Sequence, residues 1–241
     1  MSALARLGAV GRRALRVGWR PGRVYRLPTR VGTVPYRVVR ADRGTPTNDA
    51  PVLVVGLHGY GSDEAQLATL VGLDLPWPAI YLAPRAAHAD GEGYSWFDIE
   101  VGPNGRPRPG DIRPALARVH AFADAAQAAW GTRGSVLVGY SQGGALTLAA
   151  ATVDQGRFDA FAVVAGGVVE LPTDAVAGVS LFLAVGTLDP AVPATEMRET
   201  ADALTQAGMD LTYHESAAPH VVTSEQRVAL SGWLGTLTLP L

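Results

Sequence analysis

Ser141 stands at the centre of a pattern that can make a serine hydroxyl reactive. Residues 139–143 read Gly-Tyr-Ser-Gln-Gly and match G-x-S-x-G, the nucleophile elbow pattern. An apolar run at 135–139 precedes the serine and an Ala- and Leu-rich run at 145–151 follows it, which predicts strand, turn and helix. The alternative, an ordinary glycine-rich helix cap, is disfavoured by these flanking elements. The pattern therefore predicts a nucleophilic serine at the carboxyl end of a strand.

A nucleophilic serine needs a general base and an acid that orients this base. Asp189 follows a predicted strand at 180–185, and His220 follows a predicted strand at 211–215. Groups just past the carboxyl ends of parallel strands meet at one edge of the sheet. We therefore predict that His220 accepts the Ser141 proton and that Asp189 holds the imidazole in the required tautomer.

The remaining candidates fit these roles less well. Asp174 is the alternative acid, and near-normal turnover of an Asp189→Asn variant would point to it or to another acid. The other four histidines occupy a glycine loop better suited to backbone contacts, a long loop, a predicted helix and the interior of a strand; they are His58, His88, His120 and His214.

Two backbone N–H groups are predicted to form an oxyanion hole. The negative charge that develops on the substrate oxygen needs fixed donors, each worth about 3 kcal/mol of barrier. We expect one donor to be the N–H of Gln142, directly after the serine. The second is the N–H of Tyr60, between Gly59 and Gly61 in the loop after the first buried strand. An ordinary strand-to-helix turn is the alternative for that loop, but its pairing with an elbow favours the oxyanion role.

Strands and helices alternate along the chain, which predicts an α/β fold. We expect a mostly parallel central sheet with helices on both faces, an antiparallel hairpin at its edge, and no separate lid domain, because 48 positions separate Ser141 from Asp189. The order Ser, Asp, His is that of the α/β-hydrolase fold. The expected strands are 24–27, 34–40, 51–57, 79–83, 158–165, 180–185 and 211–215; the expected helices are 111–130 with Asp111 as cap, 194–207 and 221–234. Residues 84–110 are predicted to form a long irregular functional loop.

The composition limits the chemistry that the chain can perform. The 241 residues are 48% hydrophobic and 17% charged, which suits a single domain with a sizeable core. The absence of Cys excludes a disulfide, a thiolate nucleophile and a Cys-ligated metal. We predict that catalysis needs no metal and no cofactor.

Every basic residue is Arg, and these residues are concentrated at the N-terminus. Residues 1–43 hold 11 Arg and one acid, whereas the remainder holds 9 Arg and 21 acids. We predict a disordered or peripheral basic arm at 1–22, followed by a single domain at 23–241. The favoured interpretation of the arm is a solvated tail, with weak contact to anionic lipid as the alternative.

Several partner classes are not supported by the sequence. Arginines interrupt the apolar positions of residues 1–20, so neither a secretory signal nor an integral membrane span is predicted. Nucleic-acid binding has no support beyond those arginines. We expect a cytoplasmic monomer or homodimer whose partner is a small-molecule ester.

The motifs together resemble the phospholipase/carboxylesterase family of α/β-hydrolases, which includes bacterial carboxylesterases and acyl-protein thioesterases. The resemblance covers the chain from about residue 34 to its end and rests on residues 57–63, 95–98, 139–144 and 186–193 and on Pro219-His220. In that family the Trp-Phe/Tyr-Asp segment lines the acyl pocket, so the resemblance implies that Trp96 contacts substrate. We also predict a substrate contact for Tyr60.

These features predict a serine carboxylesterase that works through an acyl-enzyme. Without a lid domain the site should be fairly open, which favours short- to medium-chain esters. The alternatives within the class are an acyl thioesterase and a lysophospholipase, which use the same triad. A non-catalytic binding protein of hydrolase fold is disfavoured because all three triad residues are present.

Overall fold

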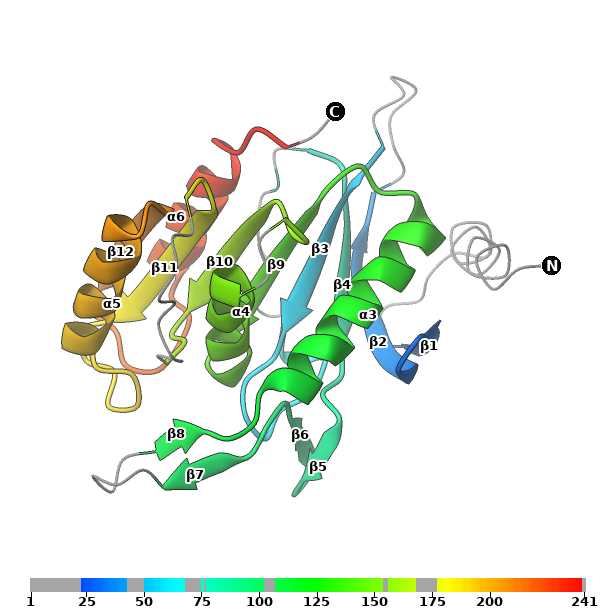
Figure 1. Cartoon of the computed structure of the whole chain (residues 1–241), viewed down its shortest axis with the longest axis horizontal. Helices are drawn as coiled ribbons and strands as arrows, with labels where there is room; N and C mark the ends of the chain where they lie inside the picture. Colours follow the sequence, from blue (N-terminus) through cyan, green and yellow to red (C-terminus); the bar gives the residue numbers. More distant parts are fainter. Residues whose placement is uncertain are drawn as a thin grey trace.

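A central sheet of eight strands organises the molecule (Figure 1). The computed structural model describes residues 23–42, 50–67, 75, 77–101, 107–153, 156–167 and 177–239, and the predicted arm at 1–22 lies outside them. In spatial order the strands are β1 (Val24–Thr29), β2 (Gly32–Ala41), β4 (Ala79–Pro84), β3 (Val52–Leu57), β9 (Ser135–Tyr140), β10 (Ala160–Val164), β11 (Ser180–Gly186) and β12 (Asp210–Ser216). The strands β4, β3, β9, β10, β11 and β12 run parallel to one another. Strands β1 and β2 form the predicted antiparallel edge hairpin, and β2 is antiparallel to β4.

The central strands are buried on both faces. All six residues of β3 are buried, which explains why its sequence is continuously apolar instead of alternating. Leu53, Val55 and Leu57 join one hydrophobic cluster, whereas Val52 and Val54 join a second cluster on the opposite face. Both faces of the sheet are therefore covered, as the sequence predicts.

Among the described residues, four helices cover these faces. Helices α3 (Arg113–Trp130), α4 (Gln142–Val153) and α5 (Ala194–Gln206) contribute to the cluster that contains Val55, whereas α6 (Ser224–Leu234) contributes to the cluster that contains Val54. Figure 1 shows α3 and α4 lying across one face of the sheet. The predicted α/β-hydrolase architecture, with helices on both faces, is confirmed.

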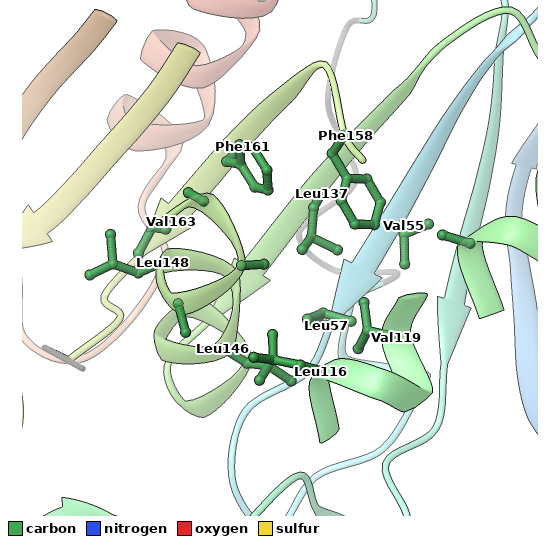
Figure 2. Packing of buried hydrophobic residues seen from close by; sticks show 14 of the residues in the cluster. Val55, Leu57, Leu116, Val119, Leu137, Leu146, Leu148, Phe158, Phe161 and Val163 are labelled. Carbon is green, nitrogen blue, oxygen red and sulfur yellow. The ribbon is translucent and has the colours of Figure 1, made fainter. Parts of the chain in front are cut away.

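Helix α4, which follows the candidate nucleophile, is buried almost all round. Every residue from Gln142 to Thr152 is buried. Figure 2 shows Leu146 and Leu148 of this helix in the same layer as Leu137 of β9 and Val163 of β10. A helix enclosed in this way has little freedom to shift, so the turn before it is held in place.

The stretch 84–110 is more regular than the sequence predicts. It contains two small antiparallel pairs, β5 (His88–Asp90) with β6 (Gly93–Ser95) and β7 (Ile99–Val101) with β8 (Pro107–Pro109). These strands are three residues long, too short to leave a readable period of alternating side chains. Two small hairpins therefore stand where one irregular loop was expected.

Two helix starts also differ from their predictions. Asp111 is not the N-cap of α3; Ile112 holds that position, and the Asp111 carboxylate instead accepts a hydrogen bond from the Arg113 N–H at 3.0 Å. Helix α6 begins at Ser224 instead of residue 221 because Thr223 and Gln226 form a capping box, in which each side chain accepts a backbone N–H. His220 consequently lies in a loop before the helix.

We expect Leu137→Ala to destabilise the fold strongly. Leu137 is fully buried in β9, beneath helix α4. Its truncation leaves a cavity, so the free energy of unfolding should fall by about 2–5 kcal/mol in urea denaturation. Val228→Ala, at a side chain 73% exposed on α6, should change this free energy by less than about 0.5 kcal/mol. Equal effects of the two variants would contradict the packing described here.

Candidate active site

The turn between β9 and α4 holds Ser141 in a strained conformation. Its φ of 53° lies in the left-handed region, which few residues other than glycine adopt. The Ser141 N–H donates to the Val164 carbonyl of β10 at 3.1 Å. A Cβ on Gly139 would lie closer than 3.0 Å to the Gly143 carbonyl, and a Cβ on Gly143 would lie equally close to the Leu57 carbonyl. Both glycines of the pattern are therefore required by close backbone approach.

The three predicted triad residues lie in one hydrogen-bonded chain. His220 Nε2 is 2.9 Å from Ser141 Oγ, and His220 Nδ1 is 2.6 Å from Asp189 Oδ2. An ionised carboxylate can only accept a hydrogen bond, so Nδ1 carries the proton of a neutral imidazole. Nε2 is then free to accept the serine proton. The alternative acid, Asp174, lies outside the described residues.

The carboxylate of Asp189 is fixed on both of its oxygens. While Oδ2 accepts the histidine hydrogen bond, Oδ1 accepts the backbone N–H groups of Ala191 at 2.8 Å and Val192 at 2.9 Å. The side chain has no exposed surface. These contacts hold the carboxylate in a single orientation toward the imidazole.

The loop that carries His220 crosses the end of β11. The carbonyl of His220 accepts a hydrogen bond from the Tyr140 hydroxyl at 2.8 Å, and the two rings lie 5.4 Å apart. A Cβ on Gly186, the last residue of β11, would collide with the Ala218 carbonyl. Leu188 donates its N–H to that carbonyl at 3.1 Å. The absence of a side chain at Gly186 therefore lets the histidine loop pass close to the strand end.

The end of β10 is equally compact. Ala165, directly after the strand, has a φ of 50° and donates its N–H to the Ala184 carbonyl of β11 at 2.8 Å. A Cβ on Gly166 would lie within 3.0 Å of the backbone of Gly144 in α4. The backbone directly after β10 therefore packs tightly against α4.

Both predicted oxyanion donors flank the serine. A Cβ on Gly59 would lie 3.3 Å from the Ser141 Cβ, so Tyr60 follows directly after a residue that borders the serine. Gln142 is the first residue of α4, where backbone N–H groups have no partner within the helix and the dipole favours negative charge. The arrangement suits stabilisation of an oxyanion on a group attached to Ser141.

A cleft of about 410 Å³ opens over Ser141 and His220. Tyr60 lines it, and most other lining side chains are apolar. They come from the segment between β6 and β7, the β7–β8 hairpin, the loop after Asp189 and the start of α5, and they include Phe97, Ile99, Pro109, Val192, Pro193 and Met197. Arg108 and Glu196 are the charged lining residues from these elements. The cleft suits a neutral, partly apolar ligand.

Trp96, predicted to contact substrate, lies beneath the cleft wall instead of lining it. Its side chain is 2% exposed, and its indole N–H donates to the His58 carbonyl at 2.9 Å. The neighbouring Phe97 lines the cleft. Buried hydrogen bonds therefore hold the tryptophan away from the cleft, and the next ring, that of Phe97, faces it.

The side chain of Gln142 has a positioning role that the sequence analysis missed. Its Oε1 accepts a hydrogen bond from the backbone N–H of Trp96 at 2.8 Å, and its Nε2 donates to the Phe97 carbonyl at 2.7 Å. The side chain is buried and joins the residue after the serine to the cleft wall. The pairing of two distant segments by one amide leaves no signal in either segment alone.

A buried ion pair anchors the loops on the β4 side of the site. Glu64 is fully buried, and its two oxygens accept hydrogen bonds from Arg85 Nε and Nη2, both at 2.6 Å. Arg85 also lies over the Tyr94 ring, 4.5 Å from its centroid. Burial raises the pKa of Glu64, but the hydrogen bonds from Arg85 and from the backbone, together with the charges of Arg85 and Arg37, outweigh burial and hold the pKa below its ordinary value of 4.5. Glu64 is therefore ionised at neutral pH.

Within the described ranges, no group of three or more His, Asp or Glu side chains is arranged to hold a metal ion. No helix in this part of the chain is long and apolar enough to cross a membrane.

The comparisons with known proteins agree with the fold and the motifs. The family model described as Phospholipase/Carboxylesterase matches residues 44–231. The chain therefore belongs to the phospholipase/carboxylesterase family of hydrolases, which confirms the predicted family. A search of curated protein sequences gave no match.

Solved structures of this fold include esterases and a thioesterase. A carboxylesterase from Mesorhizobium loti shares 21% identity with a TM-score of 0.71, covering 85% of this chain and 95% of that chain. The Bacillus cereus carboxylesterase shares 22% identity with a TM-score of 0.67, covering 83% and 93%. Acyl-protein thioesterase 2 from Zea mays shares 19% identity with a TM-score of 0.63, covering 83% and 96%. At these identities the likeness shows the fold.

Gly143→Ala should destabilise the protein and displace the backbone at Leu57 and His58. The new Cβ would press on the Leu57 and His58 carbonyls, and such overpacking costs about 1–3 kcal/mol. The matched control is Gly232→Ala in α6, where a Cβ has open space and should stabilise by about 0.5–1 kcal/mol. Urea denaturation measures both. A stabilising effect at Gly143 would contradict the close approach of α4 to β3.

The Glu64 carboxylate should stabilise the fold in a pH-dependent way. Because its pKa is lowered in the folded state, its contribution is present above about pH 4.5 and is lost as pH falls through the folded-state pKa. Wild type should therefore lose more unfolding free energy between pH 7 and pH 3 than Glu64→Gln does. Identical pH profiles of wild type and variant in urea denaturation would contradict the ion pair.

Proposed function

We propose that the protein is a serine carboxylesterase that hydrolyses short- to medium-chain carboxylic esters through an acyl-enzyme. The observation that carries the proposal is the hydrogen-bonded chain from Ser141 through His220 to Asp189 at the base of an apolar cleft. Family membership supports ester hydrolysis as the reaction class.

Acylation follows from the positions of these groups. His220 Nε2, 2.9 Å from the hydroxyl, accepts the Ser141 proton while Oγ attacks the ester carbonyl carbon. The carbonyl oxygen, which becomes negatively charged, accepts hydrogen bonds from the backbone N–H groups of Tyr60 and Gln142. When the carbon–oxygen bond to the alcohol breaks, Nε2 returns the proton to the leaving alcohol. Asp189 stabilises the imidazolium that exists between these two transfers.

Deacylation repeats the sequence with water as nucleophile. His220 takes a proton from the water, the hydroxyl attacks the acyl carbon, and the same N–H groups bind the second oxyanion. The Ser141–acyl bond then breaks, and the proton on His220 returns to the Ser141 Oγ. The free acid leaves, and the three side chains are restored to their starting state.

The cleft favours neutral esters with acyl chains of modest length. Its volume of about 410 Å³ lies toward the small end of ligand pockets. Of its two charged lining residues, Arg108 and Glu196, the first is paired with Glu100 at 2.7 Å, so its positive charge is offset by a neighbouring carboxylate. Phe97, Ile99 and Met197 offer apolar contact instead.

Ser141→Ala should abolish hydrolysis of p-nitrophenyl esters. Wild type, assayed on chains of two to sixteen carbons, should prefer the shorter half of the series, and the variant should lose at least about 10³-fold in kcat because the nucleophile is gone. The matched control is Ser231→Ala in α6, which should keep wild-type rates. Retained activity in Ser141→Ala would overturn the proposed nucleophile.

Two further comparisons refine the same experiment. Asp189→Asn should lower kcat by about 10⁴-fold, the loss expected when the imidazole tautomer is no longer held, whereas Asp202→Asn on α5 should not. Matched oxygen and thiol esters of one acyl chain separate an esterase from a thioesterase. A thiol ester turned over much faster than its oxygen ester would replace carboxylesterase by thioesterase.

A further inference from the structure

His58, which the proposed reaction does not use, has unusually complete hydrogen bonding. It follows the last residue of β3 and is fully buried. Its Nδ1 lies 2.8 Å from the Gly59 carbonyl oxygen, and its Nε2 lies 3.1 Å from the N–H of Ala86. The indole N–H of Trp96 donates to its backbone carbonyl, and the two rings lie 5.1 Å apart. The side chain is thus held on every polar atom.

These contacts specify one tautomer of the imidazole. The backbone N–H of Ala86 can only donate, so Nε2 must present its lone pair. The ring proton of the neutral imidazole is then on Nδ1, where it donates to the Gly59 carbonyl. Burial lowers the pKa of His58 and keeps the ring in this neutral form.

The hydrogen bond to the Gly59 carbonyl also sets the direction of the Tyr60 N–H. Both groups belong to one peptide unit, and no peptide bond in the described residues is cis. In a trans unit the carbonyl and the N–H point in opposite directions. Because the carbonyl points to the buried imidazole, the N–H points away from it, and no backbone carbonyl among the described residues accepts this N–H. A hydrogen bond accepted by the carbonyl also polarises the peptide and strengthens the N–H as a donor.

The preceding peptide unit is fixed independently. The Gly59 N–H donates to Gln66 Oε1 at 2.8 Å, and Gly59 borders Ser141 without a side chain between them. With both peptide units of this glycine held, the remaining N–H has one orientation beside the serine. A glycine loop without these anchors would sample several orientations.

We propose that His58 is the positioning residue of the oxyanion hole, and that its Nδ1–H holds the Gly59 carbonyl so that the Tyr60 N–H faces the substrate oxygen. This inference rests on the proposed esterase function and extends it to a residue that does not touch the substrate. The imidazole acts through one peptide unit, and it transfers no proton during the reaction.

A matched pair of variants tests the donated hydrogen bond. Asn and Leu have nearly the same shape, and both lose the contact to Ala86, but only Asn can donate to the Gly59 carbonyl. His58→Leu should lower kcat by about 10- to 100-fold with less than about a threefold change in KM. This loss is smaller than that caused by removing an oxyanion donor outright, because the Tyr60 N–H is misdirected and not deleted. His58→Asn should recover at least about tenfold of that loss. His120→Leu, at another buried histidine, should leave kcat unchanged.

A transition-state analogue distinguishes positioning from general loosening. A trifluoromethyl ketone adds to Ser141 Oγ and places an oxyanion in the hole, so its inhibition constant should rise in His58→Leu by the same factor as kcat/KM falls. An unchanged inhibition constant, or a His58→Leu enzyme with wild-type kcat, would overturn the inference while the esterase proposal stands. A wild type without ester turnover would overturn both.

The tautomer can be measured in the unaltered protein should the variants fail to fold. Nitrogen-15 NMR of the histidine rings should show His58 as the neutral Nδ1–H form at pH 7. An Nε2–H form or an imidazolium at this position would contradict the inference without any substitution.

Discussion

The close approach of helix α4 to strands β3 and β9 is the constraint on which the rest of the site depends. A Cβ on Gly139 of β9 would collide with the backbone of α4, and a Cβ on Gly143 of α4 would collide with the backbone of β3, so both positions require glycine. The same approach forces Ser141 into a left-handed conformation and brings Gly59 beside it. The strain is sustained by a helix that is buried almost all round and cannot relax toward solvent.

Buried polar contacts then fix the loops that face the cleft. Glu64 with Arg85, the His58 imidazole and the Gln142 amide each join segments far apart in the sequence. The Glu64, His58 and Gln142 side chains are buried, and the Arg85 side chain is 23% exposed. In a low-dielectric interior the hydrogen bonds of such pairs are costly to break, so they hold the loop backbone in fixed positions.

The parts of the site that follow from local pattern could be predicted from the sequence. The elbow, the strand ends carrying Asp189 and His220, and the parallel sheet all rest on short-range periodicity and turn chemistry, and the structure brings the three side chains together. The exchange of Trp96 for Phe97 at the cleft could not be predicted, because it depends on hydrogen bonds to residues far away in the sequence. The start of α6 at Ser224 could have been predicted from the sequence, because Thr223 and Gln226 have the spacing of a capping box.

The absence of a side chain at Gly186, the end of β11, limits where insertions can be accepted in this chain. The histidine loop starts from β12 and must pass the ends of β11 and β10 to reach Ser141 on β9. A side chain at Gly186 would collide with this loop, whereas a side chain at Gly166 would collide with helix α4. The β7–β8 hairpin borders the cleft without lying across this route. Loop grafts that reshape the binding surface are therefore compatible with the hairpin, whereas added bulk at Gly186 would push the histidine loop, and with it the base, away from the nucleophile.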